Sequence, residues 1–556
     1  MRNRPENHLF YGDNLAVLRK EVADESVDLI YLDPPFNSNA NYNILFKSPT
    51  GSSSDAQIEA FEDTWHWNDH AEDAFDQVAR SGNTKAFDLL NAMRGFLGDN
   101  DMLAYLAMMA VRLIELHRVL KPTGSLYLHC DPTASHYLKL LLDGVFGADN
   151  FQNEIVWRRT SSSNNPKRWG PVHDILFFYS RSGSFKWNDT RMPLSQSYMD
   201  SKYRHSDDRG TYRLSDLTAS GTRSGDSGKP WRGFDPNPIG RHWGVPSAIV
   251  AALTDRTDLT SQEKLDLLDA NDFIYWTPGR GGKPGFPQLK RHLTTGQAIQ
   301  DFVDDIPPIN SMAVERLGYP TQKPLALLER IIAASSNPGD VVLDPFCGCG
   351  TAVHAAQKLG RQWLGIDITH LAISLIEKRM KAAFPDIAFT VEGTPKDLAS
   401  AVDLATRDKY QFQWWAVSMV DAMPFGGKKK GADGGIDGLI YFKPDGRKTE
   451  KALVSVKGGD NVGVQMIRDL HSAMEREKAP IGVFITKALP TSVMEKEAAA
   501  VGRFHSEATG KSYARLQIIT LAELFQGKKP DMPYVDPTAG MKRAGREDMS
   551  SQGSLL

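Results

Sequence analysis

The most distinctive short segment of the chain is Asp33-Pro34-Pro35-Phe36, which follows the apolar run 27–32. Prolines have no N–H to donate and hold the backbone stiff, so the pair fixes the chain between a carboxylate and an aromatic ring. Two adjacent prolines also mark ordinary turns. Taken alone, the segment predicts either a turn at the end of a strand or a loop that handles a substrate.

A second segment, 341–351, reads VVLDPFCGCGT and places a glycine-rich turn between a predicted strand and a predicted helix. Glycine lets the backbone approach a ligand closely, and α/β folds bind ligands at the carboxyl ends of strands. Gly348 and Gly350 lack the third glycine of the dinucleotide fingerprint. Asp367, after the next strand, is placed to accept hydrogen bonds from two ribose hydroxyls. The pattern favours S-adenosylmethionine, with an NAD-type ligand as the alternative.

The elements that must position these residues alternate between strand-like and helix-like patterns. Apolar runs at 27–33 and 124–131 predict strands, and helical spacing over 102–120 predicts a helix between them. After about residue 319 the pattern continues with a helix at 324–335, a strand at 341–344, a helix at 351–359 and a strand at 362–366. Such alternation predicts an α/β fold with a parallel sheet wrapped by helices.

Composition sets broad limits on the protein. Its 556 residues are enough for two or three domains, and the net charge of -3 shows no global preference for an acidic or basic partner. The cysteines, Cys130, Cys347 and Cys349, are too few for a disulfide framework and indicate a reducing cytoplasm. No segment provides the roughly 20 apolar residues of a membrane span. We therefore expect a cytoplasmic protein with no membrane association.

Local charge is different in the segment 157–243, which is rich in Ser, Asn, Gly, Arg and aromatic residues. It contains 15 Lys and Arg residues against eight Asp residues and no Glu. A local positive excess suits contacts to phosphates. An irregular insertion of this length within a domain is usually functional, although an inert surface insertion is the alternative.

Taken in order, seven segments resemble the amino-group DNA methyltransferases of the β type, in which the catalytic motif precedes the cofactor motif. The segments are LFYGDNLAVL, LDPPFNSNANYN, LYLHCDPTASHYLK, FQNEIVWRR, HDILFFYS, ERLGYPTQKPLALLERII and LDPFCGCGT. They span about residues 8–390. The resemblance implies a Rossmann-like S-adenosylmethionine-dependent methyltransferase domain at 1–395, with a target-recognition region inserted at 157–317.

The resemblance also implies how 33–36 would act. An exocyclic amino group is a poor nucleophile because its lone pair is delocalised into the base. The Asp33 carboxylate and the Pro34 carbonyl, aimed by the proline pair, would accept its two hydrogens, and Phe36 would stack on a base flipped out of the duplex. Adenine is the expected base because DPP[YF] is commoner among adenine enzymes. Cytosine N4 is the alternative.

Further site residues follow from matching the family's motifs. Those expected at the cofactor are Asp13, Lys323, Asp344, Phe346, Gly348, Gly350, Thr351 and Asp367. Those expected to contact phosphates or guanine in double-stranded DNA are Arg158, Arg159, Lys167 and Arg168, each of which taken singly could equally be a solvated surface charge. A homodimer and association with the nucleoid are additional expectations.

The stretch 410–527 resembles the Mrr-like restriction endonucleases through DGGIDG and a strand carrying Ser455-x-Lys457. In such folds an Asp and a second acid bind magnesium while Lys polarises the attacking water. This implies that Asp437 binds Mg²⁺ and that Lys457 is catalytic, with Asp433 as a possible second acid. Ser455 departs from the usual Gln or Glu and is a poorer magnesium ligand. A domain that only binds DNA, or an unrelated α/β accessory domain, is the alternative.

Together these features predict one polypeptide with two DNA activities, methylation and cleavage, acting as a restriction–modification system. A solitary methyltransferase with a DNA-gripping C-terminal domain is the second hypothesis, and a reader of methylation state without turnover is the third. No GxxxxGK[ST] loop is present, so an ATP-driven motor is not expected. The tail 528–556 has few apolar residues and is predicted to be disordered.

Overall fold

The structure, a computed structural model, divides the chain into two units. Residues 1–188 and 300–555 form the first and residues 189–299 the second. The described residues are 7–35, 41–47, 53–62, 67–160, 167, 169–279, 284–293, 296–310, 313, 315–317, 319, 321–425, 435–442, 444–445, 449–507, 509–533 and 547, with backbone alone for 41–47 and 53–62.

A nine-stranded sheet organises the first unit, with the strand order β16-β6-β7-β5-β2-β17-β18-β1-β19. Neighbouring strands are parallel except where β7 pairs with β5 and β6. The strands are β1 (Asn7–Tyr11), β2 (Val27–Leu32), β5 (Leu120–Cys130), β6 (Phe151–Arg158), β7 (His173–Ser180), β16 (Phe302–Val303), β17 (Val341–Asp344), β18 (Gln362–Asp367) and β19 (Phe389–Glu392). A separate hairpin joins β3 (Asn41–Lys47) to β4 (Ser53–Glu62).

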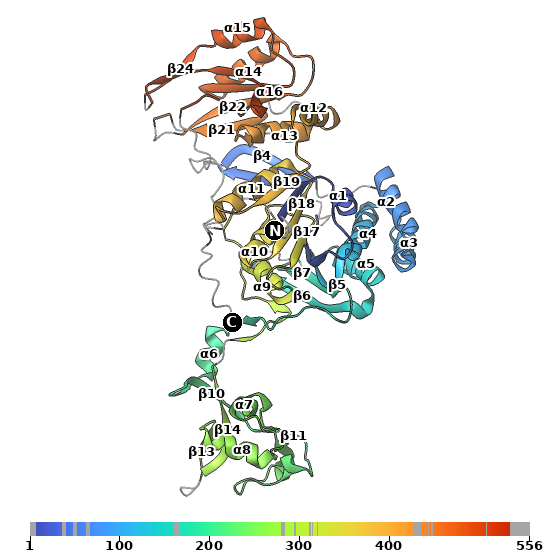
Figure 1. The fold of residues 1–556 in the computed structure, drawn as a ribbon, viewed down its shortest axis with the longest axis vertical. Helices are drawn as coiled ribbons and strands as arrows, with labels where there is room; N and C mark the ends of the chain where they lie inside the picture. Colours follow the sequence, from blue (N-terminus) through green and yellow to red (C-terminus); the bar gives the residue numbers. More distant parts are fainter. Residues whose placement is uncertain are drawn as a thin grey trace, which may run out of the picture. The chain divides into compact units, whose positions relative to one another are not determined.

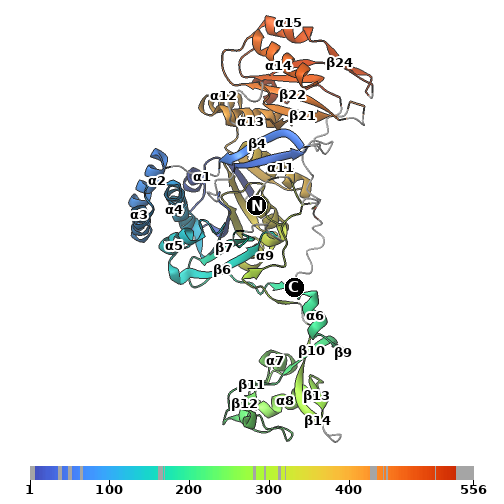
Figure 2. The same ribbon diagram turned by 180° about the vertical axis from the view of Figure 1, so that it is seen from behind.

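Helices cover both faces of this sheet (Figures 1 and 2). One face carries α1 (Asn14–Glu21), α2 (Asp69–Arg80), α3 (Thr84–Leu97), α4 (Asp101–Val119) and α5 (Ser135–Phe146), and the other carries α9 (Leu325–Ser335), α10 (Thr351–Lys358) and α11 (His370–Ala383). The predicted elements of the α/β fold are therefore confirmed. The predicted helix 324–335 begins one residue later because Pro324 is its N-cap.

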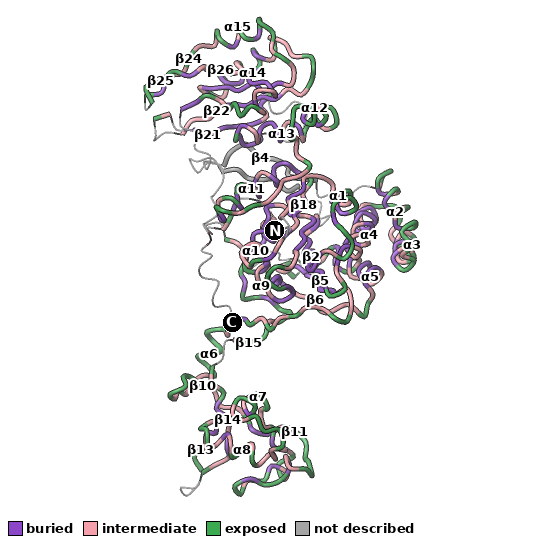
Figure 3. The backbone as a smooth tube through the Cα atoms, in the orientation of Figure 1, coloured by how far each residue is buried: buried purple, intermediate pink, exposed green. Residues whose placement is uncertain are grey.

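Strand β2 shows why the sheet is covered on both sides. Ile30 and Leu32 pack into the cluster of α1–α5, whereas Leu29 and Tyr31 pack into the cluster of α9–α11. The whole strand is buried (Figure 3), which explains its continuous apolar sequence. None of the helices among the described residues is long and apolar enough to cross a membrane.

The direction of the chain's connections reverses between the adjacent strands β2 and β17. From β17 the chain passes through α10 to β18 on one side, and from β2 it passes through α2–α4 to β5 on the other. Open α/β sheets bind ligands at such a point, beyond the carboxyl ends of the strands. The two segments singled out in the sequence, 33–36 and 345–351, both begin there.

The second unit, 189–299, is built on a four-stranded antiparallel sheet with the order β13-β14-β10-β9. Trp231 and Trp243 lie in its core with Leu217 and Leu289. Its elements are β8 (Arg191–Met192), α6 (Gln196–Lys202), β9 (His205–Asp207), β10 (Gly210–Asp216), β11 (Thr218–Ser220), β12 (Arg241–Trp243), α7 (Ser247–Leu253), α8 (Ser261–Ala270), β13 (Ile274–Pro278), β14 (Pro284–His292) and β15 (Gln297–Ala298). The expected insertion 157–317 contains this unit together with β7 and β16 of the main sheet.

The C-terminal part of the first unit has its own five-stranded sheet, with the order β20-β21-β22-β23-β26. Strands β22, β23 and β26 are parallel, and β21 is antiparallel to β22. Its elements are α12 (Leu398–Arg407), α13 (Lys409–Met419), β20 (Met423–Pro424), β21 (Gly438–Phe442), β22 (Glu450–Lys457), α14 (Val464–Arg476), β23 (Ile481–Thr486), α15 (Ser492–Ala500), β24 (Arg503–Ser506), β25 (Lys511–Ala514), β26 (Leu516–Thr520) and α16 (Leu521–Phe525). Most of the tail predicted to be disordered lies outside the described residues.

Candidate functional site

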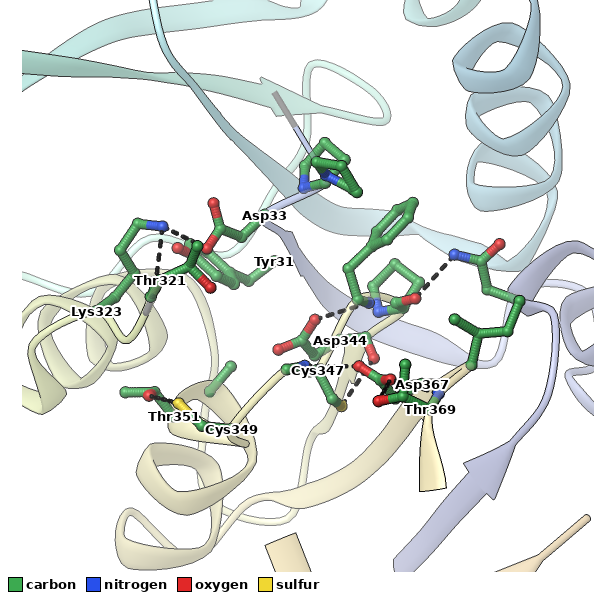
Figure 4. Close-up of a pocket in the computed structure, with 18 of the residues that line it drawn as sticks. Tyr31, Asp33, Thr321, Lys323, Asp344, Cys347, Cys349, Thr351, Asp367 and Thr369 are labelled. Carbon is green, nitrogen blue, oxygen red and sulfur yellow. Dashed lines mark hydrogen bonds and ion pairs between the residues drawn. The ribbon is translucent and has the colours of Figure 1, made fainter. Parts of the chain in front are cut away.

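A cavity of about 260 Å³ opens at the carboxyl ends of β2, β17 and β18 (Figure 4). It collects most of the site residues predicted from the sequence. Those lining it are Asp13, Asp33, Pro34, Pro35, Lys323, Asp344, Phe346, Gly348, Thr351 and Asp367. Phe36 lies outside the described residues. Segments that are about 300 residues apart in the chain therefore form one site.

The carboxylate of Asp33 is held on one side only. Its Oδ2 accepts a charged hydrogen bond from Lys323 Nζ, and Figure 4 shows the two side chains facing each other. Its Oδ1 is buried and has no hydrogen-bond partner among the described residues. A buried acceptor without a donor costs about 1–3 kcal/mol, so this oxygen fits a donor that a substrate brings. Lys323, expected beside the cofactor, lines the same cavity but binds Asp33.

The glycine-rich loop between β17 and α10 depends on two glycines in the left-handed region. Gly348 has φ +51° and Gly350 has φ +74°, a conformation that costs other residues free energy. A Cβ on Gly350 would lie 2.8 Å from Ile376 Cγ1, and one on Gly348 would lie 3.2 Å from Tyr319 Cε1. Gly350 is the N-cap of α10 and does not line the cavity itself. The two glycines together let the backbone of this loop lie against the cavity.

Asp367 ties this loop to the end of β18. Its Oδ2 accepts the Gly348 N–H at 2.9 Å, and its Oδ1 accepts the backbone N–H and the hydroxyl of Thr369, both at 2.8 Å. Burial raises the pKa of Asp367 to about 6, although these hydrogen bonds oppose the shift. A carboxylate oxygen can accept more than one hydrogen bond, so contacts to ribose hydroxyls stay a prediction.

A third carboxylate, Asp344, lies at the end of β17. Burial raises its pKa to about 8, and the charges of Asp33 and Asp367 raise it further, while the Phe346 N–H opposes the shift. Its Oδ1 accepts that N–H at 3.0 Å. The carboxylates of Asp33, Asp344 and Asp367 repel one another, and a cationic ligand relieves that repulsion. The cavity is therefore suited to a cation-bearing molecule.

One residue of the cavity wall, Arg112 on α4, was not anticipated from the sequence. Its Nη2 donates to Asp13 Oδ2 at 2.7 Å and its Nε donates to Asn14 Oδ1 at 2.6 Å. The Asn14 amide donates in turn to the Pro345 carbonyl at 2.9 Å. Asp13 also caps α1 through the Ala16 N–H. The signal available was an arginine between two apolar stretches of this helix, MLAYLAMMAV before it and LI after it.

Of the four residues predicted to contact DNA, Arg158 is the last residue of β6 and the other three follow this strand. Strand β6 is antiparallel to β7, which is antiparallel to β5, so the end of β6 lies at the same edge of the sheet as the cavity. Arg158 and Lys167 are exposed there. Arg159 pairs with the buried carboxylate of Asp174, with 3.0 Å between Nη1 and Oδ1. Arg168 lies outside the described residues.

The C-terminal domain brings Asp437 and Ser455 together. Asp437 Oδ2 accepts the Val456 N–H at 2.6 Å and the Ser455 hydroxyl at 3.4 Å, and its Oδ1 accepts the Gln413 amide at 3.1 Å. Lys457 follows two residues after Ser455 on β22. Gln413 was not predicted, because neutral residues carry little signal.

This arrangement does not complete a magnesium site. Within the part of the chain that the structure describes, no group of three or more His, Cys, Asp or Glu is placed to hold a metal. Asp433, the expected second acid, lies outside that part. Magnesium prefers carboxylate and water oxygens, and the hydrogen bonds to Asp437 from Gln413 on α13 and from Ser455 and Val456 on β22 come from neutral groups.

Comparison with known protein families identifies two regions. The family model described as DNA methylase matches residues 27–378, and the model described as restriction endonuclease matches residues 404–523. Both resemblances found in the sequence are thereby confirmed. The matched regions contain the cavity residues from β2 to α11 and the Asp437–Lys457 segment, respectively.

Individual relatives agree with the first match. The type II methyltransferase M.EcaI of Enterobacter cloacae is 30% identical over 412 residues, 73% of this chain and 76% of its own. The DNA adenine methyltransferase YhdJ of Escherichia coli K12 is 26% identical over 376 residues, 67% of this chain and 83% of its own. The match to the solved M1.HpyAVI–SAM complex covers 67% of this chain and 98% of the M1.HpyAVI chain, with 13% sequence identity and a TM-score of 0.29.

Proposed function

Since the chain belongs to the N6/N4 DNA methylase family, we propose that it moves a methyl group from S-adenosylmethionine to the exocyclic amino group of adenine in duplex DNA. The observation that supports this most is Asp33 Oδ1, a buried acceptor without a partner among the described residues, on a side chain that lines the cavity. An amino hydrogen is the donor it lacks. The other carboxylate oxygen is held by Lys323.

The chain's residues activate the amino group by accepting its hydrogens. Asp33 Oδ1 accepts a hydrogen bond from one N–H of the amino group. The Pro34 carbonyl, whose direction Pro35 fixes, accepts a hydrogen bond from the other. Both bonds draw the nitrogen lone pair out of conjugation with the base. The Lys323 ion pair fixes the rotation of the Asp33 carboxylate, and Phe36 stacks on the flipped base.

The cofactor's proposed neighbours suit a cationic nucleoside. When bound, S-adenosylmethionine supplies an electrophilic methyl group on a sulfonium. Asp367 is assigned to the ribose hydroxyls, and the backbone of Gly348 and Thr351 lines the approach from the loop. The Asp33 carboxylate offsets positive charge, and a nearby cation would favour the ionised form of Asp344. The mutual repulsion of these acids in the free protein supports a cation as the occupant.

Adenine is proposed over cytosine for two reasons. The catalytic segment has the DPP[YF] form, and a relative that matches over most of its length is named a DNA adenine methyltransferase. N4 methylation of cytosine is the alternative, since the same acceptors would serve its amino group. Digestion of methylated DNA to nucleosides and mass spectrometry separates the two products.

The methyl transfer itself is tested with tritiated cofactor and duplex DNA. Asp33→Ala should lower transfer by about 100-fold or more, because one of two positioned groups at the reacting nitrogen is lost. Asp305→Ala is the matched control, since Asp305 also pairs with a cation, Arg330, but lies outside the cavity. Retention of transfer by Asp33→Ala at the level of the control would overturn the proposal.

We propose as a second activity that the C-terminal domain cleaves DNA with magnesium, completing a restriction–modification system in one chain. The supporting observation is that Asp437 contacts the strand carrying Ser455 and Lys457. Fusion raises the effective concentration of both activities at one site on the duplex. Cleavage of unmethylated plasmid should require magnesium and disappear in Asp437→Asn. Absence of cleavage with methylation intact would instead favour a domain that only binds DNA.

A further inference from the structure

A row of polar side chains, buried on the adjacent strands β2, β5 and β7 of the main sheet, begins beside the cavity and ends just beyond β6. The Tyr31 hydroxyl on β2 bonds to His129 Nδ1 on β5 at 2.9 Å. His129 Nε2 bonds to Asp174 Oδ2 on β7 at 3.2 Å. Asp174 Oδ1 pairs with Arg159 Nη1, just beyond β6, at 3.0 Å. The row therefore connects the base-handling strand to the segment predicted to meet DNA.

These side chains are unusually deep for polar groups. Tyr31 is 3% exposed, His129 0% and Asp174 2%. The Trp157 ring packs edge-on against His129, with 5.8 Å between the ring centroids. Buried polar networks cost stability unless each member is satisfied, and an apolar packing often serves as well. Leu176, which flanks Asp174 on the same face of β7, shows that this layer accepts apolar residues.

Tyr31 also lines the cavity, two residues before Asp33 on the same side of β2. The pKa of Asp174 is lowered: burial opposes this, but the His129 hydrogen bond and the charges of Lys323 and Arg159 favour the ionised carboxylate. An ionised Asp174 accepts a hydrogen from His129 Nε2. When the imidazole carries its one proton on Nε2, Nδ1 has a lone pair and the Tyr31 O–H donates to it.

We propose that Tyr31 is a further catalytic residue of the methyl transfer and that His129 and Asp174 are positioning residues that commit the Tyr31 proton to His129. The Tyr31 oxygen then presents only lone pairs to the target amino group, beside Asp33. The nitrogen would gain its fourth bond as the methyl–sulfur bond breaks, and it would carry positive charge until one of its protons passes to the Asp33 carboxylate; preorganised lone pairs stabilise that charge. This inference rests on the proposed methyl transfer to DNA.

The first test removes the hydroxyl alone. Tyr31→Phe should lower the single-turnover rate about tenfold to 100-fold at saturating cofactor and DNA, with both dissociation constants within twofold of the wild type. Tyr127→Phe is the matched control: it is a buried tyrosine whose hydroxyl bonds to Ser335 at 2.7 Å, outside the cavity. A wild-type rate in Tyr31→Phe, or a loss confined to cofactor affinity, would overturn the assignment.

The second test asks whether Asp174 acts through Tyr31. Asp174→Asn keeps the shape of the side chain but no longer fixes which ring nitrogen of His129 carries the proton. It should therefore slow the single turnover nearly as much as Tyr31→Phe. The double variant should be no slower than Tyr31→Phe within about twofold, because both changes remove one interaction. Multiplied losses would mean that Asp174 acts only on the fold. If Asp33→Ala abolishes transfer while Tyr31→Phe is fully active, this inference fails and the proposed function stands.

Discussion

The two candidate sites of this chain differ in what surrounds their central aspartate. The Lys323 cation holds one oxygen of Asp33, and the other oxygen is buried without a hydrogen-bond partner among the described residues. Asp437 accepts hydrogen bonds from the neutral donors of Gln413, Ser455 and Val456, which engage both oxygens. The first site has an acceptor ready for a substrate, whereas the second must give up internal hydrogen bonds to bind one.

The largest expected effect comes from replacing the carboxylate of each site with an amide, one site at a time. Asp33→Asn should lower methyl transfer about 100-fold or more, because an amide no longer presents an anionic acceptor at Oδ1, and should leave DNA cleavage unchanged. Asp437→Asn should leave methyl transfer within twofold of the wild type. Tritium incorporation and plasmid nicking, measured on the same preparations, check both. Loss of methylation in Asp437→Asn would show that the sites are not independent.

A second change should make the C-terminal site resemble an acidic metal site. Gln413→Glu adds a carboxylate 3.1 Å from Asp437 Oδ1 with almost no change in volume. Two close carboxylates repel each other until a cation neutralises them, so magnesium affinity and cleavage should rise about tenfold. Calorimetry and plasmid cleavage measure this. Gln465→Glu makes the same change beside Asp469, outside the site, and an equal gain there would contradict the account.

The cofactor loop offers a smaller test of its required backbone. Gly350→Ala places a Cβ in the left-handed region and 2.8 Å from Ile376 Cγ1. The free energy of unfolding should fall by about 1–3 kcal/mol, and cofactor affinity should weaken as the loop shifts. Gly183→Ala is the control because its Cβ would meet nothing within 4 Å. Equal stability of the two variants by denaturant unfolding would contradict this role for Gly350.

The smallest expected effect concerns the pH dependence of Asp344. Its pKa is raised to about 8 by burial, so between about pH 4 and pH 8 the folded state keeps a proton that the unfolded state has lost. Its contribution to stability is therefore fully present in acid and is lost as pH rises through about 8. Asp344→Asn should flatten the fall in stability between pH 6 and pH 8.5. Parallel unfolding profiles for variant and wild type would count against the raised pKa.

The main fold was predictable because its signal is local. The apolar runs of β2 and β17 and the helical spacing of α4 and α10 each lie within a few residues. The small second unit was harder, because strands such as β11 and β12 are three residues long and the core consists of scattered tryptophans. Such short strands show no alternation that a sequence pattern can detect.

The candidate site was predictable in membership but not in geometry. The motifs named Asp33, Lys323 and Asp367, and all three line the cavity. The Asp33–Lys323 pair joins residues 290 apart, and no local pattern says which carboxylate a lysine will meet. Arg112 and Gln413 went unnoticed for the same reason, since their partners are set by how α4 and α13 pack.

The most direct test concerns Asp33 Oδ1, which is proposed to accept a hydrogen bond from an adenine amino group. Wild-type protein is incubated with duplex DNA and S-adenosylmethionine carrying a trideuterated methyl group, and the DNA is digested to nucleosides for mass spectrometry. The predicted result is N6-methyladenosine heavier by the three deuterons, absent with Asp33→Asn. N4-methylcytosine as the product would contradict the choice of base, and labelled adenine at equal level in Asp33→Asn would contradict the mechanism.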